Sequence, residues 1–130
     1  MIVDTSALFA ILAEEDDAGH FAEQLDNAMG DLTISAGNYL EAGIVLDRRG
    51  DSKISARLDE LLQLTEIEIA PVTETQARIA RQAYRDFGKG SGHPARLNFG
   101  DCFAYALAKE RGDALLFKGD DFARTDIRKA

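Results

Sequence analysis

Short apolar segments alternate with longer amphipathic segments along the whole chain. The short segments stand at residues 1–3, 31–34, 67–72 and 114–117. Apolar runs of this length, bounded by polar or turn residues, are typical of strands buried in a sheet. We therefore predict a strand at each run, with Pro71 interrupting the third, and a further edge strand at residues 126–129.

Between the predicted strands, apolar residues recur at helical spacing. Helices are predicted over residues 8–13, 18–29, 35–49 and 73–87, around residues 54–62, and from residue 98 to Gly112. Ser35 and the capping-box sequence that starts at Thr73 mark two helix starts. Strands that alternate with helices indicate one α/β domain, residues 1–130, in which helices cover both faces of a parallel sheet.

Three further local predictions concern the core and the loops. The helix over residues 35–49 is expected to bury a stripe formed by Ala36, Tyr39, Leu40 and Ile44. The aromatic residues Phe99, Phe103 and Tyr105 are expected to pack in the core rather than to stack on bases. The glycine-rich segment 88–94 matches no phosphate-binding loop, and we predict a mobile surface loop there.

Composition limits the class of protein. The chain has 130 residues, of which 45% are hydrophobic and 29% charged, as in an ordinary soluble domain. Its only cysteine, Cys102, allows no internal disulfide or cysteine-based zinc site, and we expect it to be a small core residue. No apolar run is long enough to span a bilayer and no leader-like segment precedes Asp4, so we expect a cytoplasmic protein without a membrane partner.

The net charge of −8 argues against a generic nucleic-acid binder, whose binding surface is usually basic. It does not exclude a nuclease that binds RNA through a metal ion and a local basic patch. It also suits a basic protein partner.

Acidic residues follow the predicted strands. Asp4 comes directly after the first strand, Asp120 and Asp121 follow the last, Asp101 opens a helix, and Glu41 lies early in the helix after the second strand. In open α/β sheets, ligands bind at the carboxyl ends of the strands. A carboxylate cluster without histidine or cysteine suits Mg²⁺ or Mn²⁺, whereas without a metal the like charges would raise one another's pKa values.

Each of these acids also has a structural interpretation, and the sequence leaves both open. Asp4 could cap the first helix, and Asp101 could close a capping box with Asn98. The pair Asp120–Asp121 could be a polar turn, and Glu41 a surface residue of a helix.

The sequence resembles the PIN-domain ribonucleases in four segments, which occur in the family's order and extend over essentially the whole chain. They are residues 3–8, 35–41, 97–103 and 115–126. The sequences of these segments are most similar to those of the VapC toxins of type II toxin–antitoxin systems. The resemblance implies a three-layer α/β/α sandwich with a central parallel sheet and a homodimer formed by helices among residues 35–65. It also implies Mg²⁺- or Mn²⁺-dependent cleavage of RNA to 5′-phosphate products, and inhibition by a VapB-type antitoxin.

The resemblance also assigns roles position by position. Asp4, Glu41 and Asp101 match the acidic residues of the family, and Ser6 matches a hydroxyl that supports the metal site. Asp4 and Asp101 would bind the metal directly, and Glu41 and the fourth acid would act through water or a second ion. For the fourth acid we favour Asp120, which stands nearer the strand, with Asp121 as the alternative.

An acidic nuclease needs cations around its site. The candidates for this rim are Arg48, Arg49, Lys53, Lys89, His93, Arg96 and Lys118. For most of them an ordinary surface charge remains the alternative.

Two other functions are considered. An aspartate-based phosphotransfer domain also places acids at strand ends. A dehalogenase-like phosphatase, however, requires an aspartate where Ser6 stands, and a receiver domain requires one after the middle strand, which ends at Ala70 and Pro71. A non-catalytic binding module that keeps the fold is the second alternative, and it is disfavoured by the presence of the full set of acids.

Overall fold

A parallel four-stranded sheet forms the centre of the molecule in a computed structural model, which describes residues 1–130. Its strands are β1 (Ile2–Val3), β2 (Thr33–Ser35), β3 (Glu68–Ala70) and β4 (Leu115–Leu116). Their order across the sheet is β3-β2-β1-β4, and every neighbouring pair is parallel. The strands are shorter than the apolar runs that predicted them.

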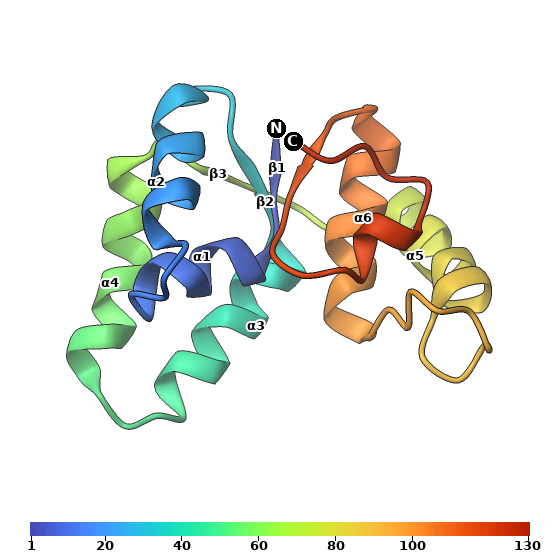
Figure 1. Ribbon diagram of the computed structural model, residues 1–130, viewed down its shortest axis with the longest axis horizontal. Coiled ribbons are helices and arrows are strands. Elements are labelled where there is room, and N and C mark those ends of the chain that lie inside the picture. The colour runs from blue at the N-terminus through green and yellow to red at the C-terminus, as the bar shows by residue number, and fades with distance from the viewer.

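Helices cover both faces of the sheet (Figure 1). They are α1 (Thr5–Leu12), α2 (Ala18–Asn27), α3 (Ala36–Asp47), α4 (Ser52–Leu64), α5 (Glu74–Phe87) and α6 (Phe99–Arg111), and a 3₁₀ turn, η1, spans Phe122–Arg124. The first four helices contribute to the hydrophobic core on one face, and α5 and α6 form the core on the other. This arrangement confirms the predicted three-layer α/β/α sandwich.

Alternation of side chains along the strands explains why two cores form. In β1, Ile2 lies in the core beneath α5 and α6, whereas Val3 lies in the core beneath α1–α4. Leu115 and Leu116 of β4 divide in the same way. Successive residues of a strand point to opposite faces, so a sheet covered on both sides needs apolar residues at consecutive positions.

The predicted helix boundaries have identifiable caps. The Ser35 hydroxyl accepts a hydrogen bond from Gly37 N at 3.3 Å at the start of α3. The Thr73 hydroxyl accepts one from Gln76 N at 3.1 Å at the start of α5. Gly112 ends α6 in the left-handed conformation, with φ of 70°, which glycine adopts without steric cost.

Three local predictions are wrong. Residues 126–129 form no edge strand, because the segment joins the sheet only by an isolated bridge between Leu115 and Lys129. The buried stripe of α3 is Asn38, Ala42 and Leu46 rather than the predicted one. Phe99 does not pack in the core and is 77% exposed, although Tyr105 is buried as expected.

None of the helices combines the length and the apolar character that a bilayer span requires.

Candidate active site

Asp4 ends β1 at the carboxyl edge of the sheet and is only 4% exposed. Its Oδ2 atom accepts hydrogen bonds from Ser6 N at 2.9 Å and from Ser6 Oγ at 2.6 Å, so Asp4 also caps α1. Burial raises the pKa of Asp4; the bonds from Ser6 oppose this rise, and the charge of Asp121 adds to it. The structure therefore confirms that Asp4 caps α1, and the same side chain is a buried carboxylate at the end of a strand.

Ser6 connects the ends of two strands. Besides donating to Asp4, its hydroxyl oxygen accepts a hydrogen bond from Lys118 N at 3.0 Å. The chain that leaves β4 is thus attached to the residue pair that follows β1. This contact fixes the start of the turn that carries Asp120 and Asp121.

Asp101 combines the two roles that the sequence leaves open. Asp101 N donates to Asn98 Oδ1 at 2.8 Å and Asp101 Oδ2 accepts from Asn98 N at 2.8 Å, which completes a capping box at the start of α6. Burial raises its pKa to about 7, and the charges of Asp4, Asp121 and Glu41 contribute to the rise. The helix cap therefore places a carboxylate among three others.

Glu41 reaches the same place from α3. Its Oε1 atom accepts a hydrogen bond from the Thr5 hydroxyl at 3.4 Å. Its carboxylate lies directly over Gly100, where an added Cβ atom would stand 2.0 Å from Glu41 Oε2. Burial raises the pKa of Glu41 and the charge of Asp4 raises it further. Position 100 thus has no room for a side chain while Glu41 keeps this place.

Sequence reasoning did not find the residue that joins α3 to α6 at the site. Asn38 is fully buried, and its Nδ2 donates to Gly100 O at 2.9 Å, while its Oδ1 has no hydrogen-bond partner. The Thr5 hydroxyl lies 3.5 Å from Asn38 O. The only signal in the sequence was a polar residue three positions before Glu41, which could not be distinguished from a surface residue.

The turn after β4 carries the adjacent acids Asp120 and Asp121. The charge of Asp121 raises the pKa of both Asp4 and Asp101. Both residues are exposed. Asp4, Glu41, Asp101 and Asp121 are thus close enough for their charges to interact, and the choice between Asp120 and Asp121 as the fourth acid stays a prediction.

The donor set fits a hard divalent cation. In both Asp4 and Asp101 the hydrogen bonds fall on Oδ2, which leaves Oδ1 as the available ligand atom. No group of three or more histidine, cysteine, aspartate or glutamate side chains lies close enough together to hold a metal ion in this structure, so water would have to supply the remaining ligands. Mg²⁺ usually keeps several water ligands and binds proteins through one or two carboxylates, so a loosely spaced oxygen cluster suits it.

Some of the cationic residues predicted to surround the site form ion pairs with acidic side chains, and others do not. Lys118 Nζ forms ion pairs with Glu15 and, at 2.8 Å, with Asp17, so it is not free to meet a phosphate. His93 Nδ1 accepts a hydrogen bond from Ala95 N. The other predicted rim residues are exposed and take part in no ion pair; they are Arg48, Arg49, Lys53, Lys89 and Arg96.

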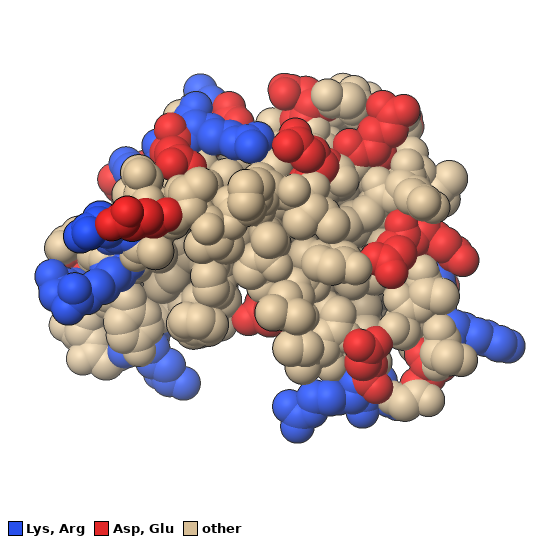
Figure 2. Space-filling model, turned by 180° about the vertical axis from the view of Figure 1, so that it is seen from behind, with Lys and Arg blue, Asp and Glu red and all other residues tan.

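The surface shows a hollow between two arms of the molecule (Figure 2). Acidic atoms are visible at its floor, and lysine and arginine side chains project from both sides. Cys102, which follows Asp101 on α6, is buried, and burial raises the pKa of its thiol to about 11. A thiol in this state is not a nucleophile at neutral pH, which agrees with the core role expected for it.

Known proteins resemble the chain over its full length. The PIN domain family model matches residues 1–128. Ribonuclease VapC28 of Mycobacterium tuberculosis is 58% identical over 131 residues, which cover 100% of this chain and 97% of that protein. Ribonuclease VapC42 of the same species is 50% identical over 130 residues, with 100% and 98% covered.

Two solved structures share the fold. Mycobacterium tuberculosis VapC20, a toxin that cleaves the sarcin–ricin loop, superposes with a TM-score of 0.77 at 18% identity, covering 99% of this chain and 97% of that one. FitAcB of Neisseria gonorrhoeae superposes with a TM-score of 0.73 at 21% identity, covering 98% and 94%.

Proposed function

The chain belongs to the PIN domain family, and we propose that it is a divalent-metal-dependent endoribonuclease, the toxin of a type II toxin–antitoxin system. The observation that carries the proposal is the meeting of Asp4, Glu41, Asp101 and Asp121 at one edge of the sheet. Burial and like charges at these positions raise the pKa values of the acids, and a bound cation would offset this cost, which supports a functional site here. The VapC ribonucleases that share half or more of its residues support the same activity.

Mg²⁺ or Mn²⁺ would be held through Oδ1 of Asp4 and Asp101, with Glu41 and Asp121 acting through water or a second ion. When bound, such an ion lowers the pKa of a water molecule and offsets charge on a phosphate. The chain's own groups orient this site: Ser6 fixes the Asp4 carboxylate, and Asn98 fixes that of Asp101. Burial and the charge of Asp4 raise the pKa of Glu41, which makes its carboxylate a better proton acceptor.

The RNA backbone would lie across the hollow, with the acids at its floor. The unpaired cations would contact phosphates; Arg48, Arg49 and Lys53 lie between the end of α3 and the start of α4, and Lys89 and Arg96 lie in the segment between α5 and α6. Contacts to phosphate can supply affinity even in a protein whose net charge is −8. The proposed RNA substrate supports the cytoplasmic location expected from the sequence.

Two protein partners follow from the same surfaces. A VapB-type antitoxin could insert an arginine among the unpaired carboxylates, because the planar guanidinium group binds carboxylates with two hydrogen bonds. A second copy of the chain could cover the exposed apolar side chains of Leu40, Ile44, Val45 and Phe99. This patch extends the predicted dimer region, residues 35–65, to the first turn of α6.

Calorimetric titration of Mn²⁺ into the purified protein, together with cleavage of end-labelled RNA, tests the proposal. Asp4→Asn and Asp101→Asn should weaken Mn²⁺ binding at least tenfold and abolish cleavage, with unchanged circular dichroism.

Asp121→Asn and Asp120→Asn form a matched pair, since the two residues are adjacent and exposed. Only Asp121→Asn should weaken binding. A folded wild-type protein that binds no Mn²⁺ would instead support the non-catalytic binding module.

A further inference from the structure

Asp121 has no side-chain contact that fixes it in the cluster. It precedes the 3₁₀ turn η1, and its carboxylate caps no backbone amide. No ion pair restrains it. Its position beside Asp4 and Asp101 therefore depends on how the backbone of residues 118–126 is held.

The residues after Asp121 fold into a tight turn. Phe122 is buried and packs against Phe117, with their ring centroids 5.1 Å apart. The Thr125 hydroxyl donates to Phe122 O at 2.7 Å and accepts from Ile127 N at 3.2 Å. These contacts fix the shape of the turn, but they lie within the segment or face the core.

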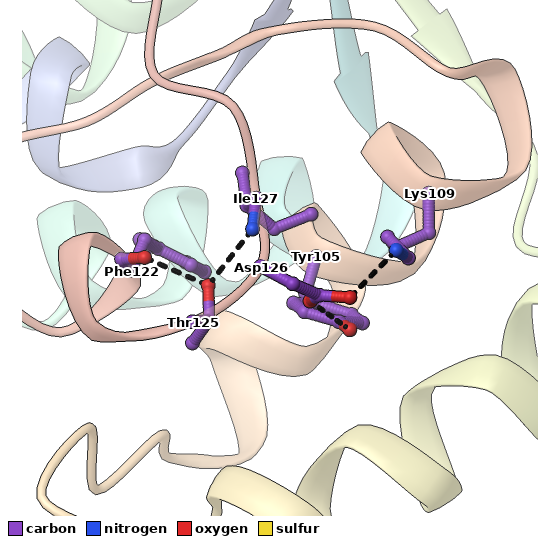
Figure 3. Close-up of polar contacts among 6 residues, drawn as sticks. All are labelled: Tyr105, Lys109, Phe122, Thr125, Asp126 and Ile127. Atoms are coloured by element: carbon purple, nitrogen blue, oxygen red, sulfur yellow. Dashed lines mark hydrogen bonds and ion pairs between the residues drawn. The ribbon is translucent and has the colours of Figure 1, made fainter.

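Asp126 attaches this turn to helix α6 (Figure 3). Asp126 Oδ1 accepts a hydrogen bond from the Tyr105 hydroxyl at 2.7 Å, and Oδ2 forms an ion pair with Lys109 Nζ at 2.7 Å. Tyr105 lies one helical turn after Asp101 on α6. The helix that presents Asp101 to the site thus also holds the segment that carries Asp121.

The two contacts of Asp126 differ in strength. Tyr105 is only 5% exposed, and its hydroxyl loses more when its hydrogen-bond partner is removed than a fully exposed hydroxyl would. Lys109 is exposed, and surface ion pairs contribute little to stability. The pKa of Asp126 is lowered by both partners, so the carboxylate is charged and accepts both bonds at neutral pH. The contact with Tyr105 is therefore the main attachment.

We propose that Tyr105 and Asp126 are positioning residues of the active site, which set the place of Asp121 relative to Asp101 through the turn between them. This inference rests on the proposed metal-dependent function. It gives a role to Asp126, at the end of the family-like segment 115–126, and this role does not involve direct binding of the metal.

Variants of Asp126 separate this role from plain stability. Asp126→Ala removes both contacts, whereas Asp126→Asn keeps an oxygen that accepts from the Tyr105 hydroxyl. In Asp126→Ala, amide exchange of Thr125 and Ile127 should accelerate and Mn²⁺ affinity should fall about tenfold, as for other outer-shell changes. Asp126→Asn should retain most of the affinity, and Tyr105→Phe should resemble Asp126→Ala.

The deciding measurement is a double-mutant cycle with Asp121→Asn. In that background Asp126→Ala should cause no further loss of Mn²⁺ affinity, because the carboxylate that it positions is absent. Glu110→Gln is the control, since Glu110 also lies on α6 but contacts Gln76 and Thr73 of the α5 start. It should leave Mn²⁺ affinity unchanged.

Faster amide exchange with unchanged Mn²⁺ affinity, or an equal loss in the Asp121→Asn background, would overturn the positioning role. Absence of Mn²⁺ binding in the folded wild type would overturn the metal site itself, and the positioning role with it.

Discussion

Asp101 shows how one side chain can serve both the fold and the site. Its Oδ2 atom closes the capping box of α6, while the remaining oxygen belongs to the acidic cluster. Helix N-termini favour negative charge, which offsets part of the cost of a buried carboxylate. The offset is incomplete, because its pKa still rises to about 7.

Stability of the metal-free protein should therefore depend on pH through Asp101. Between about pH 4 and pH 7 the unfolded chain releases the Asp101 proton whereas the folded protein retains it. The free energy of unfolding consequently falls as pH rises through this window. Because Asp101 is partly exposed, we expect a loss of about 1–2 kcal/mol. Urea unfolding at pH 5 and pH 8 should show a smaller loss in Asp101→Asn, which keeps an acceptor for Asn98 N; an equal loss in both proteins would contradict the assignment.

Gly100 is the second residue at which fold and site meet. In Gly100→Ala the new Cβ atom would overlap Glu41 Oε2, so the Glu41 side chain must move out of the cluster. We expect Mn²⁺ affinity to fall several-fold, while the helix-forming preference of alanine limits the effect on the melting temperature. Combining it with Glu41→Gln should add little further loss. Gly43→Ala, on α3 with open space around its Cβ position, is the control and should leave Mn²⁺ affinity unchanged.

At this scale the sequence predicts most of the acidic residues of the site, but it does not predict the residues that hold them in place. Asp4, Glu41 and Asp101 follow from strand ends and helix starts, and the structure brings them together. The choice between Asp120 and Asp121 depends on the turn geometry after β4, which adjacent identical residues do not reveal. Asn38 escaped notice because its role depends on a contact with Gly100, which is far away in the sequence.

At the scale of elements, the apolar residues of α3 account both for the wrongly predicted buried face and for an exposed apolar face. Its apolar residues lie all around the helix, so periodicity could not decide which face is buried. The buried face contains Asn38, Ala42 and Leu46, and the opposite side leaves Leu40 61% exposed and Ile44 48% exposed. A helix with apolar residues on two faces can bury the second face only against another protein chain. The strands were easier to predict, because their continuous apolar runs indicated a sheet that is covered on both faces.

The contact between α3 and α6 should depend on Asn38. Asn38→Ala leaves Gly100 O without its partner and opens a small cavity, which together should lower the free energy of unfolding by about 2–3 kcal/mol. Asn38→Asp, which cannot donate to the carbonyl and adds a charge beside Glu41, should be at least as destabilising. Chemical denaturation measures both. A variant as stable as the wild type would show that other contacts hold α6 against α3.

At the scale of the whole molecule, the distribution of charge matters more than its sum. Acidic atoms are visible in the hollow, and lysine and arginine side chains project on both sides of it (Figure 2). A net charge of −8 would suggest a protein that avoids RNA, yet the local arrangement permits phosphate contacts. The sequence indicated the layers of the fold, but it could not show which cations remain free, because ion pairs such as Lys118 with Asp17 join distant segments.

The exposed apolar patch leads to a prediction about the oligomeric state. Leu40, Ile44, Val45 and Phe99 form a surface beside the hollow that a monomer would leave in water. Patches of this kind usually mark protein contacts. If a second copy covers this one, sedimentation velocity at micromolar concentration should show a dimer in the wild type and a monomer in Ile44→Glu. Met29→Glu is the matched control, because Met29 is 46% exposed and lies outside both the patch and residues 35–65, so the dimer should persist. If the wild type is a monomer, the patch is instead available to the antitoxin, and binding of a VapB-type peptide should weaken in Ile44→Glu but not in Met29→Glu.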